Sequence, residues 1–86
     1  MQRPVGERSN LRDLVLFLAS SLVDNPDQVG VREIQGDDAV IIEVTVAPDD
    51  MGKIIGKHGR IARAIRTVTR ALAAREGKRV MVEIVE

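Results

Sequence analysis

The sequence predicts an α+β domain with the element order αββααβ, in which a three-stranded mixed sheet is covered on one face by three helices. Three observations predict this fold. The chain has 86 residues, which is room for one domain. Apolar residues recur with helical spacing near the N-terminus and again after residue 60, and three short stretches are rich in β-branched residues, as strands are.

Residues 1–8 show no periodicity and are expected to form a flexible N-terminal tail, so the folded domain is expected to span residues 9–86. The first helix should begin near Ser9 or Asn10, because either side chain serves as an N-cap, and Asn25 with Pro26 should end it. One face of this helix carries an apolar stripe, formed by Leu11, Leu14, Val15, Leu18 and Leu22.

Two strands are predicted next, at residues 29–35 and 39–46, and the Gly-Asp-Asp turn between them predicts a hairpin. A last strand at residues 80–85 should return to the same sheet after two helices. Such a crossover connection makes the strands that it joins parallel. The second strand is therefore expected at the centre of the sheet, with the first antiparallel to it and the third parallel.

Two helices are predicted between the second and third strands. The short one covers residues 48–55, with a proline at its first position, and helix capping is the preferred interpretation of Asp49 and Asp50 in its first turn. The long one covers residues 60–75, and Gly77 is placed to end it as a C′ glycine.

The charges are divided unevenly along the chain. Thirteen basic residues balance 13 acidic ones overall, yet nine of the basic residues lie between residues 53 and 79, where Glu76 is the one acidic residue. This segment predicts a positive face for an anionic partner, whereas the acidic remainder limits indiscriminate binding. The alternative interpretation is a charged helix face that serves only solubility.

The composition argues against several classes of function. The chain has no Cys, one histidine (His58) and one aromatic residue (Phe17), so we expect no disulfide, no metal site, no cofactor and no catalytic constellation. We therefore predict a protein that is not an enzyme and that works in the cytoplasm. The apolar run at residues 14–23 is too short to span a membrane, and Glu7 and Asp13 argue against a secretory signal.

The most informative segment is Gly56-Lys57-His58-Gly59, which we call the GxxG loop. Glycine permits positive φ angles and a close backbone approach, and the amides that open the following helix attract phosphate. Four side chains add hydrogen-bond donors at the same place: Lys53, Lys57, His58 and Arg60. The combination predicts a cradle for a phosphate backbone.

The spacing of the GxxG loop does not fit two other phosphate-binding motifs. A P-loop requires G-x-x-x-x-G-K-[ST] and a dinucleotide site requires G-x-G-x-x-G, and neither is present. A tight turn between two helices with no ligand stays open as an alternative. His58 is equally compatible with a solvated loop residue and with a direct nucleic-acid contact.

These residues carry a resemblance to a known family. The stretch Val46 to Val68, centred on Ile55-Gly56-Lys57-His58-Gly59, resembles a KH domain, and the αββααβ order corresponds to its type II arrangement. The chain is similar to the small bacterial RNA-binding proteins that consist of a single KH domain. The resemblance covers residues 10–86.

The resemblance implies that the GxxG loop clamps about four unpaired nucleotides while the bases lie in an aliphatic groove. The expected RNA-binding residues are Lys53, Ile54, Ile55, Gly56, Lys57, His58, Gly59, Arg60, Ala62, Arg63 and Ile65. Ala62 departs from the family, which often has a larger aliphatic residue there, so base preference does not transfer. With Phe17 as the one aromatic, binding must rely on charge, hydrogen bonds and aliphatic contacts, which predicts modest, salt-dependent affinity.

The long helix also presents an apolar arc opposite its arginine stripe. Ile61, Ala64, Val68 and Ala71 are a candidate dimer interface, and the edge of a small core is the alternative. The resemblance implies a homodimer, or a heterodimer with a second, larger KH-containing RNA-binding protein. The predicted function is a noncatalytic single-stranded RNA-binding protein, an RNA chaperone or post-transcriptional regulator. Single-stranded DNA stays open as a ligand, and a scaffold subunit whose RNA contact is secondary is the alternative function.

Overall fold

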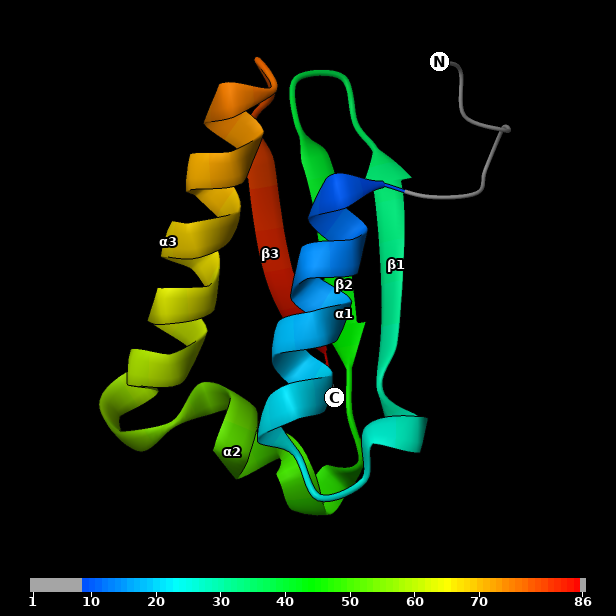
Figure 1. The fold of residues 1–86 in the computed structure, drawn as a ribbon, viewed down its shortest axis with the longest axis vertical. Helices are drawn as coiled ribbons and strands as arrows, with labels where there is room; N and C mark the ends of the chain where they lie inside the picture. Colours follow the sequence, from blue (N-terminus) through cyan, green and yellow to red (C-terminus); the bar gives the residue numbers. More distant parts are fainter. Residues whose placement is uncertain (1–8, 86) are drawn as a thin grey trace.

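The computed structural model describes residues 9–85, and the tail expected at residues 1–8 lies outside them. The predicted order αββααβ is confirmed (Figure 1). The main elements are α1 (Asn10–Leu22), β1 (Gly30–Gln35), β2 (Val40–Thr45), α2 (Met51–Ile55), α3 (Arg60–Arg75) and β3 (Val80–Val85). Three short 3-10 helices join them: η1 (Pro26–Gln28), η2 (Pro48–Asp50) and η3 (Lys57–Gly59).

The sheet has the strand order β1-β2-β3, as predicted. β1 runs antiparallel to β2, and β3 runs parallel to β2 with Ile42 opposite Val82. Helix α1 packs on β1 and β2, while α3 packs on β3 and against α1, so both lie on one face of the sheet (Figure 1). Helix α2 lies at the end of this layer, where it contacts α1 and α3.

The core lies between the helices and this face of the sheet. Alternate residues of β2 and β3 point into it because side chains of a strand alternate between faces, and the residues between them face the other side. The buried apolar residues that form the core cluster are Leu11, Val15, Ala19, Val31, Val40, Ile42, Val44, Ile54, Ile65, Ala73, Val80 and Val82. Each large aliphatic side chain buried here contributes about 1.5–3 kcal/mol to folding.

The ends of α1 and α3 are formed as the sequence predicts. The hydroxyl of Ser9 accepts a hydrogen bond from the Arg12 amide at 3.2 Å, which caps α1. At the same end of the layer, Gly77 at the C-terminus of α3 has a φ of 70°. The Lys78 amide donates to the Ala73 carbonyl at 2.8 Å, and the Gly77 amide donates to the Ala74 carbonyl at 3.1 Å, so a Schellman motif ends α3.

The interpretation of Asp50 as a helix cap was wrong. No side chain caps η2 or α2. The carboxylate of Asp50 is instead fully buried and accepts hydrogen bonds from the Asp24 amide at 3.1 Å and from the Asn25 amide and side-chain Nδ2, both at 3.0 Å. The reason is that the 3-10 turn before α2 directs this side chain inward, toward the loop that follows α1.

The charge of Asp50 is stabilised by these partners. Burial has the largest single influence and by itself would raise the pKa of the carboxyl, but the hydrogen bonds from residues 24 and 25 and the nearby Lys53 ammonium together lower the pKa below its usual value. Asp50 therefore remains ionised inside the protein and ties α2 to the end of α1.

Candidate nucleic-acid interface

The GxxG loop reverses the chain between α2 and α3 by using left-handed backbone conformations. Gly56 has a φ of 76° and Gly59 a φ of 73°, and His58 between them also has a positive φ of 58°. The Gly56 amide donates to the Gly52 carbonyl at 2.8 Å, and the Gly59 amide donates to the Gly56 carbonyl at 3.0 Å. The loop is therefore a defined turn in which three of four residues have conformations that most side chains disfavour.

The two glycines are required for different reasons. A Cβ atom at Gly56 would lie 2.8 Å from Cβ of Ile61 and 2.9 Å from its backbone nitrogen, distances at which atoms overlap. At Gly59 a Cβ atom would meet open space, so only its backbone angle favours glycine. Gly56 thus lets α3 approach the end of α2, whereas Gly59 sets the direction in which α3 leaves the loop.

The N-terminus of α3 opens at this loop. Gly59 is the N-cap residue and supplies no side chain, so no side chain hydrogen-bonds the first amides of the helix. These amides and the positive end of a 16-residue helix dipole attract an anion. The side chains of Lys57, His58 and Arg60 are exposed around them. Positive charge and exposed side-chain donors therefore surround this turn.

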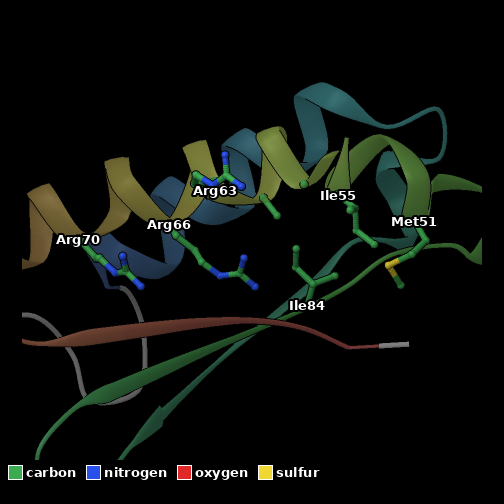
Figure 2. Close-up of a pocket in the computed structure, with 8 residues that line it drawn as sticks. Met51, Ile55, Arg63, Arg66, Arg70 and Ile84 are labelled. Atoms are coloured by element: carbon green, nitrogen blue, oxygen red, sulfur yellow. The ribbon is translucent and has the colours of Figure 1, made fainter. Parts of the chain in front are cut away.

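A groove of about 660 Å³ lies beside the loop, between α2, α3 and β3 (Figure 2). Its apolar lining comes from all three elements: Met51, Ile55, Ala62 and Ile84. Gly59 and three arginines of α3, Arg63, Arg66 and Arg70, complete it. Figure 2 shows Arg66 and Arg70 extending from α3 toward β3. The groove therefore combines an aliphatic surface with one row of guanidinium groups.

Arg66 is held in place by the sheet. Its Nε donates to the carbonyl of Val82 at 3.1 Å, on the edge of β3 that β2 does not occupy. Arg12 makes the matching bond to Val31 on β1, with Nε 3.1 Å from the carbonyl oxygen. Each edge strand therefore has a carbonyl bound by an arginine of the helical layer, and the Arg66 guanidinium is fixed between α3 and β3.

The cations of the interface are largely without acidic partners. Among the described residues, Lys57, Arg60, Arg63 and Arg70 take part in no ion pair. Lys53 differs, because its ammonium lies 3.2 Å from Oδ2 of Asp24 and 4.0 Å from Oδ1 of Asp50. The Lys53 ammonium therefore pairs with carboxylates at the junction between α1 and α2.

The structure brings only part of the predicted site to the surface of the groove. Ile55, which is 41% exposed, lines the groove together with Ala62, Arg63 and Gly59. Ile54 and Ile65 do not line the groove and are buried in the core cluster that supports it, whereas Ala62, although only 5% exposed, borders the groove. They alternate with groove residues because α2 and α3 each present one face to the sheet and another to the groove.

Sequence reasoning missed two apolar members of the groove, Met51 and Ile84. The alternation of the last strand could have indicated Ile84. It lies two residues after Val82 and four after Val80, so all three side chains point to the helical face of the sheet. Arg66 and Arg70 were assigned to the arginine stripe of the long helix but not to the site. Helical spacing from Arg63 was enough to place them on the same face.

The candidate dimer residues of α3 divide into two groups. Ala64, Val68 and Ala71 are exposed, and Val68 is 47% exposed despite its size. Ile61 is only partly exposed, because it packs against the core and beside Gly56. The outward-facing part of this set is therefore Ala64, Val68 and Ala71, and Ile61 supports the loop.

Two other kinds of feature, a metal site and a membrane-spanning helix, are absent from residues 9–85. No group of three or more His, Cys, Asp or Glu side chains there is placed to hold a metal ion. Within the same part of the chain, none of the helices is long and apolar enough to cross a membrane.

The element order, the parallel β2–β3 pair and the GxxG loop between two helices define a KH domain of type II. The family model described as KhpA/KhpB, KH domain matches residues 12–84. The chain belongs to this family, and the resemblance seen in the sequence is confirmed.

Named proteins with similar sequences support the assignment to this family. RNA-binding protein KhpA of Caldanaerobacter subterraneus is 60% identical over 73 residues, which are 85% of this chain and 97% of that protein. RNA-binding protein KhpA of Clostridium perfringens is 53% identical over 75 residues, which are 87% of this chain and 100% of that protein. These relatives are named as RNA-binding proteins, the function class that the sequence predicts.

Among solved structures, Era from Aquifex aeolicus matches with a TM-score of 0.65 and 24% identity. The match covers 98% of this chain but only 31% of the Era chain. A second Era structure, solved with a segment of 16S ribosomal RNA, has a TM-score of 0.62 and 22% identity, and this chain spans 34% of it. The Era structures support the fold.

Proposed function

We propose that this protein is a noncatalytic RNA-binding protein that clamps the backbone of single-stranded RNA at the GxxG loop. The observation that carries the proposal is the position of this loop beside the groove. Exposed cations without ion-pair partners lie beside the N-terminus of α3 at one end, and an aliphatic surface from Met51, Ile55, Ala62 and Ile84 continues from it. Phosphates fit the first part and unstacked bases fit the second.

The refined site differs from the expected one in the roles of its residues. Lys57, His58, Arg60 and the amides of α3 contact phosphate, while Ile54, Ile65 and Lys53 hold the scaffold. Arg63 and Arg66 lie along the groove and offer donors to phosphates or to base edges. Because no aromatic side chain lines the groove, stacking contributes little, and the affinity is modest and weakly dependent on sequence.

The first experiment is fluorescence anisotropy of the full chain with a labelled, unstructured RNA heptanucleotide across a salt series. Binding should weaken as salt rises, with a slope of about −0.7 for each phosphate contacted. The double variant Lys57→Asp/His58→Asp should lose about tenfold or more in affinity by the same electrostatic argument. Aspartate tolerates the left-handed conformation of residue 58, so the variant should fold, which circular dichroism checks.

Arg75→Glu is the matched control, because it reverses a charge in the last turn of α3, outside the groove. It should keep most of the affinity. A folded loop variant that binds RNA as tightly as the wild type would overturn the clamp and favour the scaffold function. Single-stranded DNA of the same sequence is the second ligand to titrate, because a clamp on phosphates need not contact a 2′-hydroxyl.

Weak, sequence-tolerant binding of unpaired strands suits an RNA chaperone or a post-transcriptional regulator, and we propose that role in the cytoplasm. The exposed row Ala64, Val68 and Ala71 on α3 also supports self-association, or pairing with a second KH-containing RNA-binding protein, because small side chains permit close helix approach. Sedimentation velocity at tens of micromolar should show a dimer that Val68→Asp weakens. A monomer in both samples would contradict self-association.

A further inference from the structure

The row of arginines on α3 runs the length of the groove and reaches a second cavity. Arg70 is eleven residues beyond Gly59, which corresponds to about 16 Å along the helix axis. It lines the groove at the end remote from the GxxG loop, and it also lines a second cavity of about 410 Å³. The second cavity is bounded by Ala39, Lys78, Arg79, Val80 and Met81 as well. The two cavities therefore meet at Arg70.

The second cavity carries positive charge that the fold does not use. Among the described residues, the guanidinium groups of Arg70 and Arg79 have no ion-pair or hydrogen-bond partner, and both residues are exposed. Lys78 is partly neutralised, because its ammonium lies 3.9 Å from Oε1 of Glu76. Two guanidinium groups thus approach one concave surface from different elements, α3 and the start of β3.

Acidic residues limit where an anionic chain can go from there. Glu43 and Glu83 lie opposite each other on the face of the sheet that the helices leave uncovered. Asp37 and Asp38 border Lys78 and Arg79 on the side of the β1–β2 turn. Glu43 is paired with Arg32 at 3.1 Å, so Glu83 and the two aspartates are the carboxylates that disfavour a polyanion on the open face beside β3 and at the hairpin turn.

We propose that Arg70 and Arg79 form a second backbone-binding subsite, which holds phosphates of nucleotides beyond the four that the GxxG loop clamps. The inference rests on the proposed RNA-binding function and adds the length and path of the ligand. Arginine suits the role because its planar guanidinium binds phosphate through two parallel hydrogen bonds.

The test compares two labelled oligonucleotides, a uridine tetranucleotide and a uridine heptanucleotide, by anisotropy with the full chain. A heptanucleotide is too short for two four-nucleotide clamps, and its four binding registers give a statistical gain of about fourfold on one clamp. We expect the wild type to bind the heptanucleotide with an affinity about tenfold higher than this statistical factor alone gives. The slope of its affinity against salt should steepen by about 0.7 for each added phosphate.

The double variant Arg70→Gln/Arg79→Gln should bind the tetranucleotide like the wild type and lose the additional gain on the heptanucleotide. Arg75→Gln, which removes one positive charge from α3 outside both cavities, should behave as the wild type with both ligands. Both substitutions of the double variant are at exposed positions, so the fold should be retained.

The outcomes separate this inference from the function on which it rests. If the wild type binds both RNAs with only the statistical difference, or if the double variant weakens both RNAs equally, the second subsite is overturned while the clamp stands. If the wild type binds neither RNA, the proposed function fails and the subsite fails with it.

Discussion

The carboxylate of Asp50 and the amides of Asn25 form a buried junction in which Oδ2 accepts hydrogen bonds from the backbone nitrogen and from Nδ2, each at 3.0 Å. The other oxygen accepts from the Asp24 amide. Residues 24 and 25 follow α1, and Asp50 directly precedes α2, so the junction fixes the helix that leads into the GxxG loop relative to the rest of the helical layer. The candidate RNA site therefore depends on an interaction that lies outside it.

Replacing Asp50 by Asn should destabilise the protein. The amide nitrogen of the new side chain would face hydrogen-bond donors of residues 24 and 25, which leaves buried donors unsatisfied. We expect the melting temperature to fall by about 5 °C or more in a domain of this size. Asp49→Asn is the matched control, because Asp49 is exposed and should be nearly neutral. Equal melting temperatures for the two variants would contradict the junction.

The same junction predicts how stability depends on pH. The folded pKa of Asp50 is lowered, so the stabilisation that follows from the shift is complete above the unfolded pKa of about 3.9 and is lost as the pH falls through the folded pKa. Urea midpoints at pH 7, 5 and 3 should show that wild type and Asp50→Asn differ most at neutral pH and converge in acid. If the difference between the two urea midpoints stays constant or widens in acid, the ionised Asp50 does not stabilise the fold in this way.

The two glycines of the GxxG loop should respond differently to alanine. Gly59→Ala should cost about 1–2 kcal/mol, the penalty of a left-handed conformation, because a Cβ there meets open space. Gly56→Ala should cost more, because its φ of 76° and ψ of 170° lie in a region that essentially only glycine adopts, and because the added Cβ would overlap Ile61. Chemical denaturation of both variants measures the order. If Gly59→Ala is the more damaging substitution, the loop geometry described above is incorrect.

The neighbouring residues Ile54 and Ile55 separate scaffold from ligand contact. Ile54 is fully buried, so Ile54→Ala should cost about 2–5 kcal/mol of stability. Ile55 is 41% exposed in the groove, so Ile55→Ala should cost less than about 1 kcal/mol while it weakens RNA binding. Denaturant unfolding and anisotropy on both variants provide the comparison. An Ile55→Ala protein with unchanged RNA affinity would remove this residue from the site.

Much of the fold could be predicted from local patterns. Helical spacing, the proline and glycine boundaries and the alternation of β2 give the order of elements, and the crossover rule gives the parallel pair. The site was harder, because motif position does not show which side of a helix faces solvent. Ile54 and Ile65 flank the GxxG loop in sequence yet point into the core, and Lys53 is turned toward Asp24 and Asp50.

The remaining differences have tertiary causes. The inward direction of Asp50 depends on a loop about 25 residues earlier in the chain, which no local pattern reveals. Ile84 reaches the groove only because β3 is an edge strand next to α3. Helical spacing already aligned Arg70 with Arg63 and Arg66, but its shared position between two cavities required the packed structure.

The most direct test of the central claim is an NMR titration of the full, isotopically labelled chain with an unstructured RNA tetranucleotide, followed through backbone amide shifts. The account predicts saturable shifts at Gly56 to Ala62, at Ile55 and at Ile84, with the uncovered face of the sheet, marked by Ile41 and Glu43, unaffected. Shifts centred on that uncovered face, or on Val68 while the GxxG loop stays unchanged, would contradict a backbone clamp at the loop.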